Sequence, residues 1–300
     1  MAGWGDWAST WKQATAAWRE SRGGVITVFP PLALAVGLRQ RIGFEHKPIV
    51  AWCFNLGALH HGFRHSVARA ALLHIDRIVV HSRAETVRYA EWLDLPRERF
   101  RFVPLQRAQI PIEEREDEEQ PFVLAMGSAR RDYATLFEAV RRSKHPTLVV
   151  AARHALEGLE IPDNVEVRSS LTSSECQRLA QRARVNVVPV RNEETASGQV
   201  TLVEAMRMGR AVVATRCMGS EDYIQPERTG LLVEPRSVED LQGAIERLWD
   251  DAALRQRLGR NAAHFTAEHC SDEAAGAALA GVLDELAENS GGNSGVCEGS

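Results

Sequence analysis

The sequence lacks the features that mark several common protein classes. Its five cysteines are odd in number and scattered, and no CxxC pair occurs, which excludes a disulfide framework and a thiolate metal cage. It has no basic excess either, because 36 basic residues face 40 acidic ones and the net charge is −4. Nucleic acid is therefore not expected as a main partner. We expect a cytoplasmic protein.

No apolar run is long enough to cross a membrane. The longest, Val25–Leu38, is interrupted by Pro30 and Pro31 and falls short of the roughly 20 residues that a bilayer needs. The N-terminus places Asp6 among early tryptophans and has no small-residue cleavage site. We therefore expect neither a transmembrane segment nor a secretory signal.

Familiar nucleotide and metal motifs are also absent. No GxGxxG follows an expected strand, and neither GxxxxGKS, GxxxxGKT nor HExxH occurs. His61 and His65 lie four positions apart on an expected helix, but no carboxylate completes a ligand set, so no metal is expected. Lysine is scarce, and an individual arginine becomes informative only where a bidentate anion contact is needed.

What is present is an alternation of short β-branched runs with longer helical stretches. Such runs, separated by helices, are typical of a parallel sheet covered on both faces. The expected strands are 25–29, 49–53, 77–81, 100–103, 122–126, 147–151, 165–167, 185–190, 211–215 and 230–233. The expected helices are 31–41, 60–74, 83–93, 132–142, 173–182, 201–208, 238–249, 252–266 and 272–288. The fold class is α/β.

One acidic stretch interrupts the alternation, and we interpret it as a solvated linker. The chain then divides into an N-terminal domain, 1–106, the linker, 107–120, and a C-terminal domain, 121–270. A C-terminal helix, 271–288, is expected to pack back toward the first domain. The Gly/Ser/Asn-rich tail, 289–300, is expected to be disordered.

An N-terminal helix carries tryptophans on one face, at spacings of three, four and seven positions. They are Trp4, Trp7, Trp11 and Trp18. The favoured interpretation is that this face docks onto the domain or onto a second subunit. Contact with a membrane surface stays open because tryptophan favours bilayer interfaces, although Lys12 and Arg19 are the only cations of the helix.

The most informative stretch is 189–224. A strand ends at Val190, a loop containing residues 197–199 follows, and a helix then carries Glu204. Gly198 allows the backbone to approach a ligand closely, and the free N–H groups at a helix start favour an anion. Glu204 could accept hydrogen bonds from a ribose diol. The pattern suits several phosphate-binding folds.

Four segments then follow one another: LVEAMRMGRAVVAT, GSEDYI, TGLLVEP and LRQRLGRNAA. In this order they resemble the donor-binding half of retaining GT-B glycosyltransferases of family 4, and the resemblance runs through most of 121–288. It implies two Rossmann-type domains with parallel sheets. It also implies that Glu204 binds the ribose of a nucleotide sugar. The residues implied for the diphosphate and sugar are Ser197, Gly198, Gln199 and Thr201.

A second segment, VLAMGSARRDYATLFEAV, matches the same family. Gly127 matches the glycine after the first strand of the donor domain, with Ser128 beside it. Arg131, with Arg130 as its neighbour, matches a basic position over the diphosphate. A guanidinium there would hold phosphate oxygens bidentately and stabilise the leaving diphosphate. The alternative is an exposed arginine at a helix start.

One position departs from the family pattern. The family has two glutamates eight positions apart, but eight positions before Glu204 this chain has Ala196. Glu193 and Glu194 lie close by, and Glu194 is a candidate to reach the sugar instead. Otherwise a variant loop holds the sugar differently, or turnover is impaired.

The first half resembles the same fold more loosely, through PIVAWCFNLG and IDRIVVHSRAETVRYAEWLDLPRERFRFVPL. Where the family often has a histidine beside the sugar, this chain has Asn55. His60 and His61 follow and are candidate catalytic residues, with a surface or packing role as the alternative. Ser82 and Glu85 are expected to form a capping box.

The strand, Gly loop and helix that normally open this fold are missing from the first half. The resemblance therefore implies a shortened acceptor-side domain. We expect its apolar edge to be covered by the tryptophan helix or by another subunit.

The resemblance implies a retaining, metal-independent glycosyltransferase without a cofactor. Its donor substrate would be a UDP- or GDP-linked sugar, and its acceptor a hydroxyl of a glycan, a lipid-linked sugar or a small molecule. A catalytically impaired binding or scaffold subunit and a nucleotide-sugar epimerase stay open as alternatives. The expected location is cytoplasmic, with peripheral contact at the inner face of the membrane left open.

Overall fold

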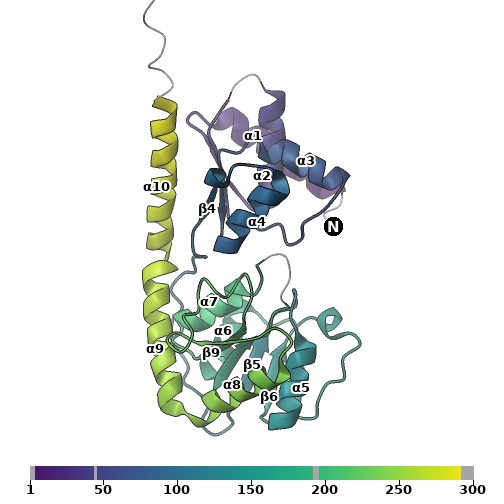
Figure 1. The fold of residues 1–300 in the computed structure, drawn as a ribbon, viewed down its shortest axis with the longest axis vertical. Coiled ribbons are helices and arrows are strands. Elements are labelled where there is room, and N and C mark those ends of the chain that lie inside the picture. The colour runs from purple at the N-terminus through teal and green to yellow at the C-terminus, as the bar shows by residue number, and fades with distance from the viewer. Residues whose placement is uncertain (1–3, 44–45, 192–195, 292–300) are drawn as a thin grey trace, which may run out of the picture. The chain divides into compact units, whose positions relative to one another are not determined.

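The computed structural model describes residues 4–43, 46–191 and 196–291 (Figure 1). The chain forms two compact units, of which the first comprises Met1–Pro104 with Ala275–Ser300 and the second Leu105–Ala274. Each unit contains one sheet in which all paired strands run parallel. The predicted α/β fold with two parallel-sheet domains is confirmed.

The first unit has four strands in the order β1-β2-β3-β4. The strands are β1 (Val25–Val28), β2 (Ile49–Trp52), β3 (Arg77–Val80) and β4 (Phe100–Phe102). The helices are α1 (Trp4–Glu20), α2 (Pro30–Ile42), α3 (Phe63–Leu72), α4 (Arg83–Leu93) and α10 (Asp272–Gly291), with a short 3-10 helix, η1 (Arg97–Arg99).

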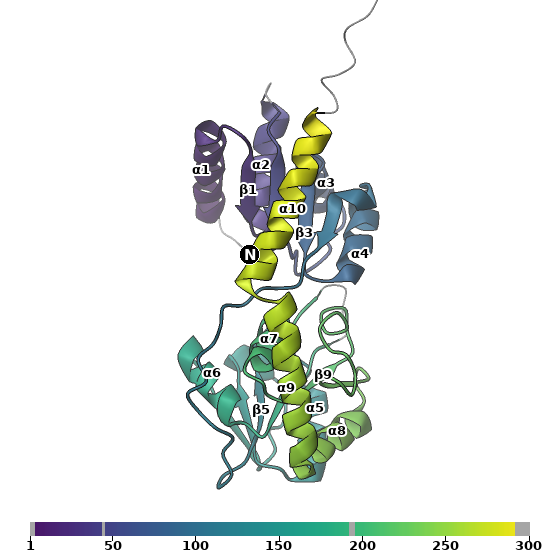
Figure 2. The same ribbon diagram turned by 90° about the vertical axis from the view of Figure 1, so that its left-hand side faces the viewer.

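Successive side chains of the central strand β2 enter two different layers. Ile49 and Ala51 pack in the core formed with α1 to α4. Val50 and Trp52 pack on the opposite face against α10, whose contributions include Val282. Figure 2 shows α10 crossing this face of the sheet. Burial on both faces explains why the strand reads as a continuous apolar run.

The tryptophan face of α1 is only half docked. Ala14 and Trp18 are buried in the first core, and the ammonium group of Lys47 lies 5.1 Å from the Trp18 ring. Trp7 and Trp11 continue the same stripe but are 41% and 38% exposed. The predicted docking onto the domain therefore holds for Trp18 and not fully for Trp7 and Trp11, for which contact with a second subunit stays a prediction.

The expected capping box at the start of α4 is also wrong. Ser82 is the N-cap residue, but its side chain makes no capping hydrogen bond. Glu85 is fully buried, and its Oε1 accepts a hydrogen bond from the Tyr89 hydroxyl at 2.9 Å. The first turn of α4 faces the core, so the Glu85 carboxylate accepts a hydrogen bond from Tyr89, one turn further along the helix.

The second unit has six strands in the order β10-β9-β8-β5-β6-β7. The strands are β5 (Val123–Met126), β6 (Thr147–Val150), β7 (Val165–Arg168), β8 (Val185–Val188), β9 (Val212–Thr215) and β10 (Leu231–Val233). The helices are α5 (Tyr133–Ser143), α6 (Ser173–Arg182), α7 (Gln199–Arg207), α8 (Val238–Asp250) and α9 (Ala252–His269), with a 3-10 helix, η2 (Arg153–Leu156).

The helices of the second unit cover the two faces of its sheet separately. Val123 and Ala125 of β5 pack with α5 and α8, whereas Leu124 and Met126 pack on the other face, where α6 lies. Val188 and Val212 share a cluster with α7. The loops after β5 and β8 therefore start from strands that are buried on both faces, which gives these loops rigid bases.

The acidic stretch 107–120 is exposed at Glu113, Glu118 and Glu119, but two of its other carboxylates are paired with arginines. Glu116 accepts hydrogen bonds from Arg184 at 3.0 Å and from Arg255 at 2.8 Å, and its side chain is 24% exposed. Asp117 pairs with Arg182 at 2.6 Å. The composition suggested solvation, but arginines of the second unit neutralise these carboxylates and fix the segment on its surface.

Candidate functional site

The candidate donor loops are the loop between β5 and α5 and the loop between β8 and α7, and they follow two neighbouring strands of the second sheet. From β5 the chain moves through β6 to β7 in one direction, whereas from β8 it moves through β9 to β10 in the other. Ligands of doubly wound sheets bind at the carboxyl ends of the strands where the order reverses. Here that point lies between β5 and β8, so Gly127 after β5 and the residues before α7 are at the expected position.

Arg131 joins the two loops. Its backbone forms an antiparallel bridge with Val190, and the residue is 8% exposed. Nε donates to the Met126 carbonyl at 2.9 Å, and Nη1 to the Ala129 carbonyl at 3.0 Å. Across the gap between the loops, Nη2 donates to Thr201 Oγ1 at 3.2 Å.

The burial of Arg131 overturns the alternative sequence interpretation of this residue. It is not an exposed helix-start arginine. It is also not free to hold a phosphate bidentately as it stands, because Nη1 donates to Ser197 Oγ at 3.5 Å as well as to Ala129. Burial lowers its pKa, although an arginine stays cationic at neutral pH. Among the described residues, no carboxylate forms an ion pair with this cation, so an anion between the loops would be stabilised by it.

Two glycines make room for this arrangement. Gly127 has a φ of 110°, and a Cβ there would lie 2.5 Å from Nη2 of Arg131. Gly198 caps α7 with a φ of 82°, and a Cβ there would lie 2.8 Å from Val190 and 2.9 Å from Val188. Both positions favour glycine through backbone conformation and through space.

The neighbouring predicted residues support the loops. Ser128 Oγ accepts a hydrogen bond from the Ala152 N–H at 2.8 Å, which ties the loop after β5 to the one after β6. Arg130 is half-buried with a left-handed φ of 56°, and its carbonyl accepts from the Arg191 N–H. Gln199 is buried, and its Nε2 donates to the Tyr223 hydroxyl at 3.4 Å.

Glu204 lies one turn after Thr201 on the same face of α7. Its side chain is 16% exposed, and its Oε1 accepts hydrogen bonds from Nε and Nη2 of Arg107. Ala196 is 5% exposed. Glu194 lies outside the described residues. The second unit thus brings Gly127, Arg131, Ser197, Gly198 and Thr201 together. Glu204 lies further along α7, the helix that Gly198 caps.

The remaining predicted catalytic residues lie in the first unit. Asn55 Oδ1 accepts a hydrogen bond from the Gly57 N–H at 2.8 Å and so shapes the turn after β2. His60 and His61 are exposed, and the carbonyl of His60 accepts a hydrogen bond from Trp92 Nε1 at 3.0 Å. These contacts describe a loop held by its backbone, with both imidazoles at the surface.

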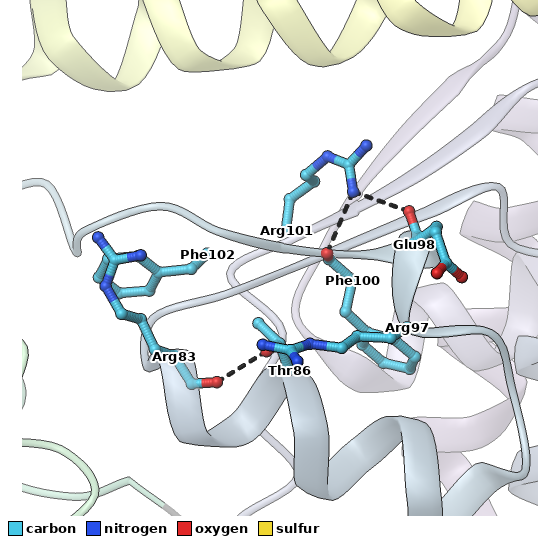
Figure 3. Close-up of a pocket in the computed structure, with 7 residues that line it drawn as sticks. All are labelled: Arg83, Thr86, Arg97, Glu98, Phe100, Arg101 and Phe102. Carbon is cyan, nitrogen blue, oxygen red and sulfur yellow. Dashed lines mark hydrogen bonds between the residues drawn. The ribbon is translucent and has the colours of Figure 1, made fainter.

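The first unit also contains a cavity of about 350 Å³ (Figure 3). Figure 3 shows the guanidinium of Arg83 against the ring of Phe102, 4.5 Å from its centroid. The lining residues are Arg83, Thr86, Arg97, Glu98, Phe100, Arg101 and Phe102. None of the residues predicted from the sequence lines this cavity.

Two residues near the donor loops of the second unit were not identified from the sequence. Arg107 carries no signal of its own, because it begins a stretch that reads as a linker. Tyr223 is part of the motif GSEDYI, but only the fold shows that its hydroxyl accepts a hydrogen bond from the Leu105 N–H at 2.9 Å.

Two negative findings hold for the part of the chain that the structure describes. Within it, no group of three or more His, Cys, Asp and Glu side chains is placed to hold a metal ion. Within the same residues, no helix combines the length and apolar character needed to span a membrane.

Residues 120–251 match the family described as Glycosyl transferases group 1. This segment is a group 1 glycosyltransferase domain. It contains both loops, Arg131 and Glu204. Arg107 lies outside the matched segment.

Other proteins resemble the chain over a greater length. Alpha-D-kanosaminyltransferase of Streptomyces kanamyceticus is 28% identical over 244 residues, which cover 74% of this chain. The match covers 62% of that relative, so the chain spans less than two thirds of its length.

Solved structures extend the likeness of the fold to both units. A glycosyltransferase from Rickettsia africae ESF-5 has a TM-score of 0.75 at 16% identity, covering 96% of this chain and 83% of that one. HepE of Anabaena in complex with UDP-glucose has a TM-score of 0.72 at 14% identity, covering 92% and 82%. The fold is that of the GT-B glycosyltransferases, and the group 1 domain is its second unit in chain order.

Proposed function

We propose that this chain is a retaining, metal-independent glycosyltransferase that transfers a sugar from a nucleoside-diphosphate sugar to an acceptor hydroxyl. The observation that carries the proposal is the buried Arg131, held by carbonyl and hydroxyl groups between two glycine loops at the switch point of a group 1 domain. A buried cation of this kind favours an anionic ligand.

The donor would lie with its diphosphate against the start of α7. The dipole of α7 favours negative charge at this end of the helix, and Arg131 donates to Thr201 in the same turn. Glu204 would accept a hydrogen bond from a ribose hydroxyl. UDP- and GDP-linked sugars are the proposed donors, which is consistent with the UDP-glucose in the complex of HepE.

Catalysis would rest on stabilising the leaving diphosphate. As the glycosidic bond breaks, negative charge grows on the diphosphate, and Arg131 with the loop amides would stabilise it without a metal ion. The acceptor hydroxyl would attack from the same face as the leaving group, and a phosphate oxygen would take its proton. This route needs no cofactor and no strong general base.

The acceptor side is proposed to involve the first unit. Asn55, His60 and His61 are candidate contacts to an acceptor glycan, lipid-linked sugar or small molecule. The exposed Trp7 and Trp11 support either peripheral contact with the inner face of the membrane or contact with a second copy. A cytoplasmic location is part of the same proposal.

A second candidate is a catalytically impaired subunit that binds the donor without turning it over. The observation that favours it is Ala196, which is buried and places a methyl group where the family has a sugar-binding glutamate. Binding of the nucleotide would survive this change, because Gly127, Arg131 and Gly198 are all present.

Turnover separates the two candidates. Purified chain is incubated with UDP- and GDP-sugars, with and without a panel of sugar and lipid acceptors, and the release of UDP or GDP is measured. The transferase predicts acceptor-dependent release, a product with the anomeric configuration of the donor, and no loss on addition of EDTA. Binding without release favours the impaired subunit, and an inverted product or an EDTA-sensitive reaction contradicts the proposed mechanism.

A further inference from the structure

Arg107 approaches the carboxylate of Glu204 from one side only. Nε of Arg107 lies 3.0 Å from Oε1, and Nη2 donates to the same oxygen. An oxygen of a carboxylate offers two lone pairs, so these two donors occupy Oε1. Among the described residues, Oε2 accepts no hydrogen bond.

The exposed pair of Arg247 and Glu227 in the same unit shows a different geometry. There Nη1 donates to Oε1 and Nη2 to Oε2, both at 2.6 Å, so that both carboxylate oxygens are used. The Glu227 side chain is 55% exposed, whereas that of Glu204 is 16% exposed. The half-buried pair of Arg107 and Glu204 differs from it, because both donors of Arg107 go to Oε1 and the described residues leave Oε2 as an open acceptor.

The segment that carries Arg107 is fixed at two further points within the second unit. The Arg107 N–H donates to the Cys270 carbonyl at 2.9 Å. Two residues earlier, the Leu105 N–H donates to the hydroxyl of Tyr223, which also accepts from Gln199 at the start of α7. The backbone that carries Arg107 is therefore fixed by the end of α9 and by Tyr223, which also contacts the start of α7.

We propose that Arg107 is a positioning residue for the donor: it holds Oε1 of Glu204 and leaves Oε2 to accept a hydrogen bond from one hydroxyl of the nucleotide ribose. This inference rests on the proposed function. Fixing the carboxylate rotamer in advance reduces the ordering cost of donor binding. With Oε1 occupied by Arg107, the contact to the ribose falls to Oε2.

The test compares nucleotides that differ by one hydroxyl. Affinities of the full chain are measured by calorimetry for UDP and GDP, and then for the 2′-deoxy and 3′-deoxy forms of whichever binds. The variants are Arg107→Ala, Arg107→Lys and Glu204→Ala, with Arg247→Ala as the matched control from an exposed pair. Thermal unfolding of each variant is recorded alongside.

We expect Arg107→Ala to weaken binding of the intact nucleotide by about tenfold, the size of one lost hydrogen bond to a charged group. Arg107→Lys should recover part of the loss, and Arg247→Ala should change nothing. With the deoxy nucleotide that lacks the contacted hydroxyl, Arg107→Ala and Glu204→Ala should both bind as the wild-type chain does. The other deoxy nucleotide should keep the full effect.

Four results would overturn the inference. An Arg107→Ala loss that is equal for all three nucleotides, with a lowered unfolding temperature, identifies a merely structural residue. Tighter binding by Arg107→Ala shows that the arginine competes with the ribose. If the wild-type chain binds neither UDP nor GDP, the proposed function fails first and this inference fails with it, whereas wild-type binding with unaffected variants removes the inference alone.

Discussion

Nη2 of Arg131 lies 3.2 Å from Oγ1 of Thr201, although the two residues are 70 positions apart in the chain. This contact joins the loop after β5 to the first turn of α7. Together with the bridge between Arg131 and Val190, it makes the two loops one structural unit at the switch point of the second sheet. A ligand bound to either loop is therefore sensitive to the guanidinium that joins them.

Gly127→Ala should damage this junction. The new Cβ would lie 2.5 Å from Nη2 of Arg131, and the φ of 110° is one that alanine rarely adopts. We expect the free energy of unfolding to fall by about 1–3 kcal/mol, as for a strained backbone position, and nucleotide binding to weaken. Chemical denaturation and calorimetry measure both.

Gly243→Ala is the matched control for that change. A Cβ at Gly243, inside α8, meets nothing within 4 Å. We expect stability to stay the same or to rise by about 0.5–1 kcal/mol, the usual gain for alanine within a helix. Equal losses at the two glycines would contradict the role given to Gly127.

Arg131→Lys tests whether the fork of the guanidinium is needed in addition to its charge. Lysine keeps the cation but cannot donate to Met126, Ala129 and Thr201 from one rigid plane. We expect a loss of about 1–3 kcal/mol in unfolding free energy, because buried carbonyl groups lose their partners. Nucleotide binding should fall as well, as titration calorimetry would show. A lysine variant as stable and as tightly binding as the wild type would refute this role.

Glu116→Gln tests the finding that the acidic stretch is part of the second unit. Its carboxylate receives Arg184 and Arg255, whose side chains are 19% and 10% exposed. We expect a loss of about 2 kcal/mol, the scale of hydrogen bonds to charged groups, together with faster proteolysis within 107–120. The exposed Glu118→Gln should behave as the wild type, and equal behaviour of the two variants would restore the picture of a solvated linker.

His81 should make the stability of the first unit depend on pH. Burial lowers its pKa below the ordinary value of 6.5, so the unfolded chain takes up the proton more readily than the folded one. The stabilisation is complete above pH 6.5 and is lost as the pH falls toward the lowered pKa. The unfolding free energy of the wild type should therefore drop more steeply than that of His81→Gln as the pH falls from about 7 to about 5, by up to about 1.4 kcal/mol per pH unit.

The exposed His60→Gln provides the comparison for that measurement. His60 is exposed, so this substitution removes an imidazole without changing the core. A His81→Gln variant with an unchanged slope would show that another group controls the acid sensitivity.

Local chemistry made the strands and the two donor loops predictable from the sequence. Gly127 and Gly198 stand where the backbone needs a positive φ, and the apolar runs of β5 and β8 are buried on both faces. The pairing of Arg107 with Glu204 was not predictable, because it joins residues 97 positions apart and depends on how the segment folds back.

Two further misreadings have the same physical origin. Glu116 and Asp117 of the acidic stretch are neutralised by arginines that follow much later in the chain, and composition alone does not show them. Periodicity placed the tryptophans of α1 on one face correctly, but it could not show that the contact ends near Ala14 and leaves Trp7 and Trp11 exposed. Patterns define faces, and only tertiary packing defines what covers them.

The central claim is that the junction of the two loops in the group 1 domain binds a nucleoside-diphosphate sugar. The most direct measurement is titration calorimetry of the full chain against UDP-, GDP-, ADP- and TDP-sugars, repeated with Arg131→Lys and Glu204→Ala. We predict that at least one donor binds with one site per chain and that each variant weakens it by about tenfold or more, the loss of one charged hydrogen bond. The account would be contradicted if none of the four donors bound, or if both variants bound the donor with the affinity of the wild type.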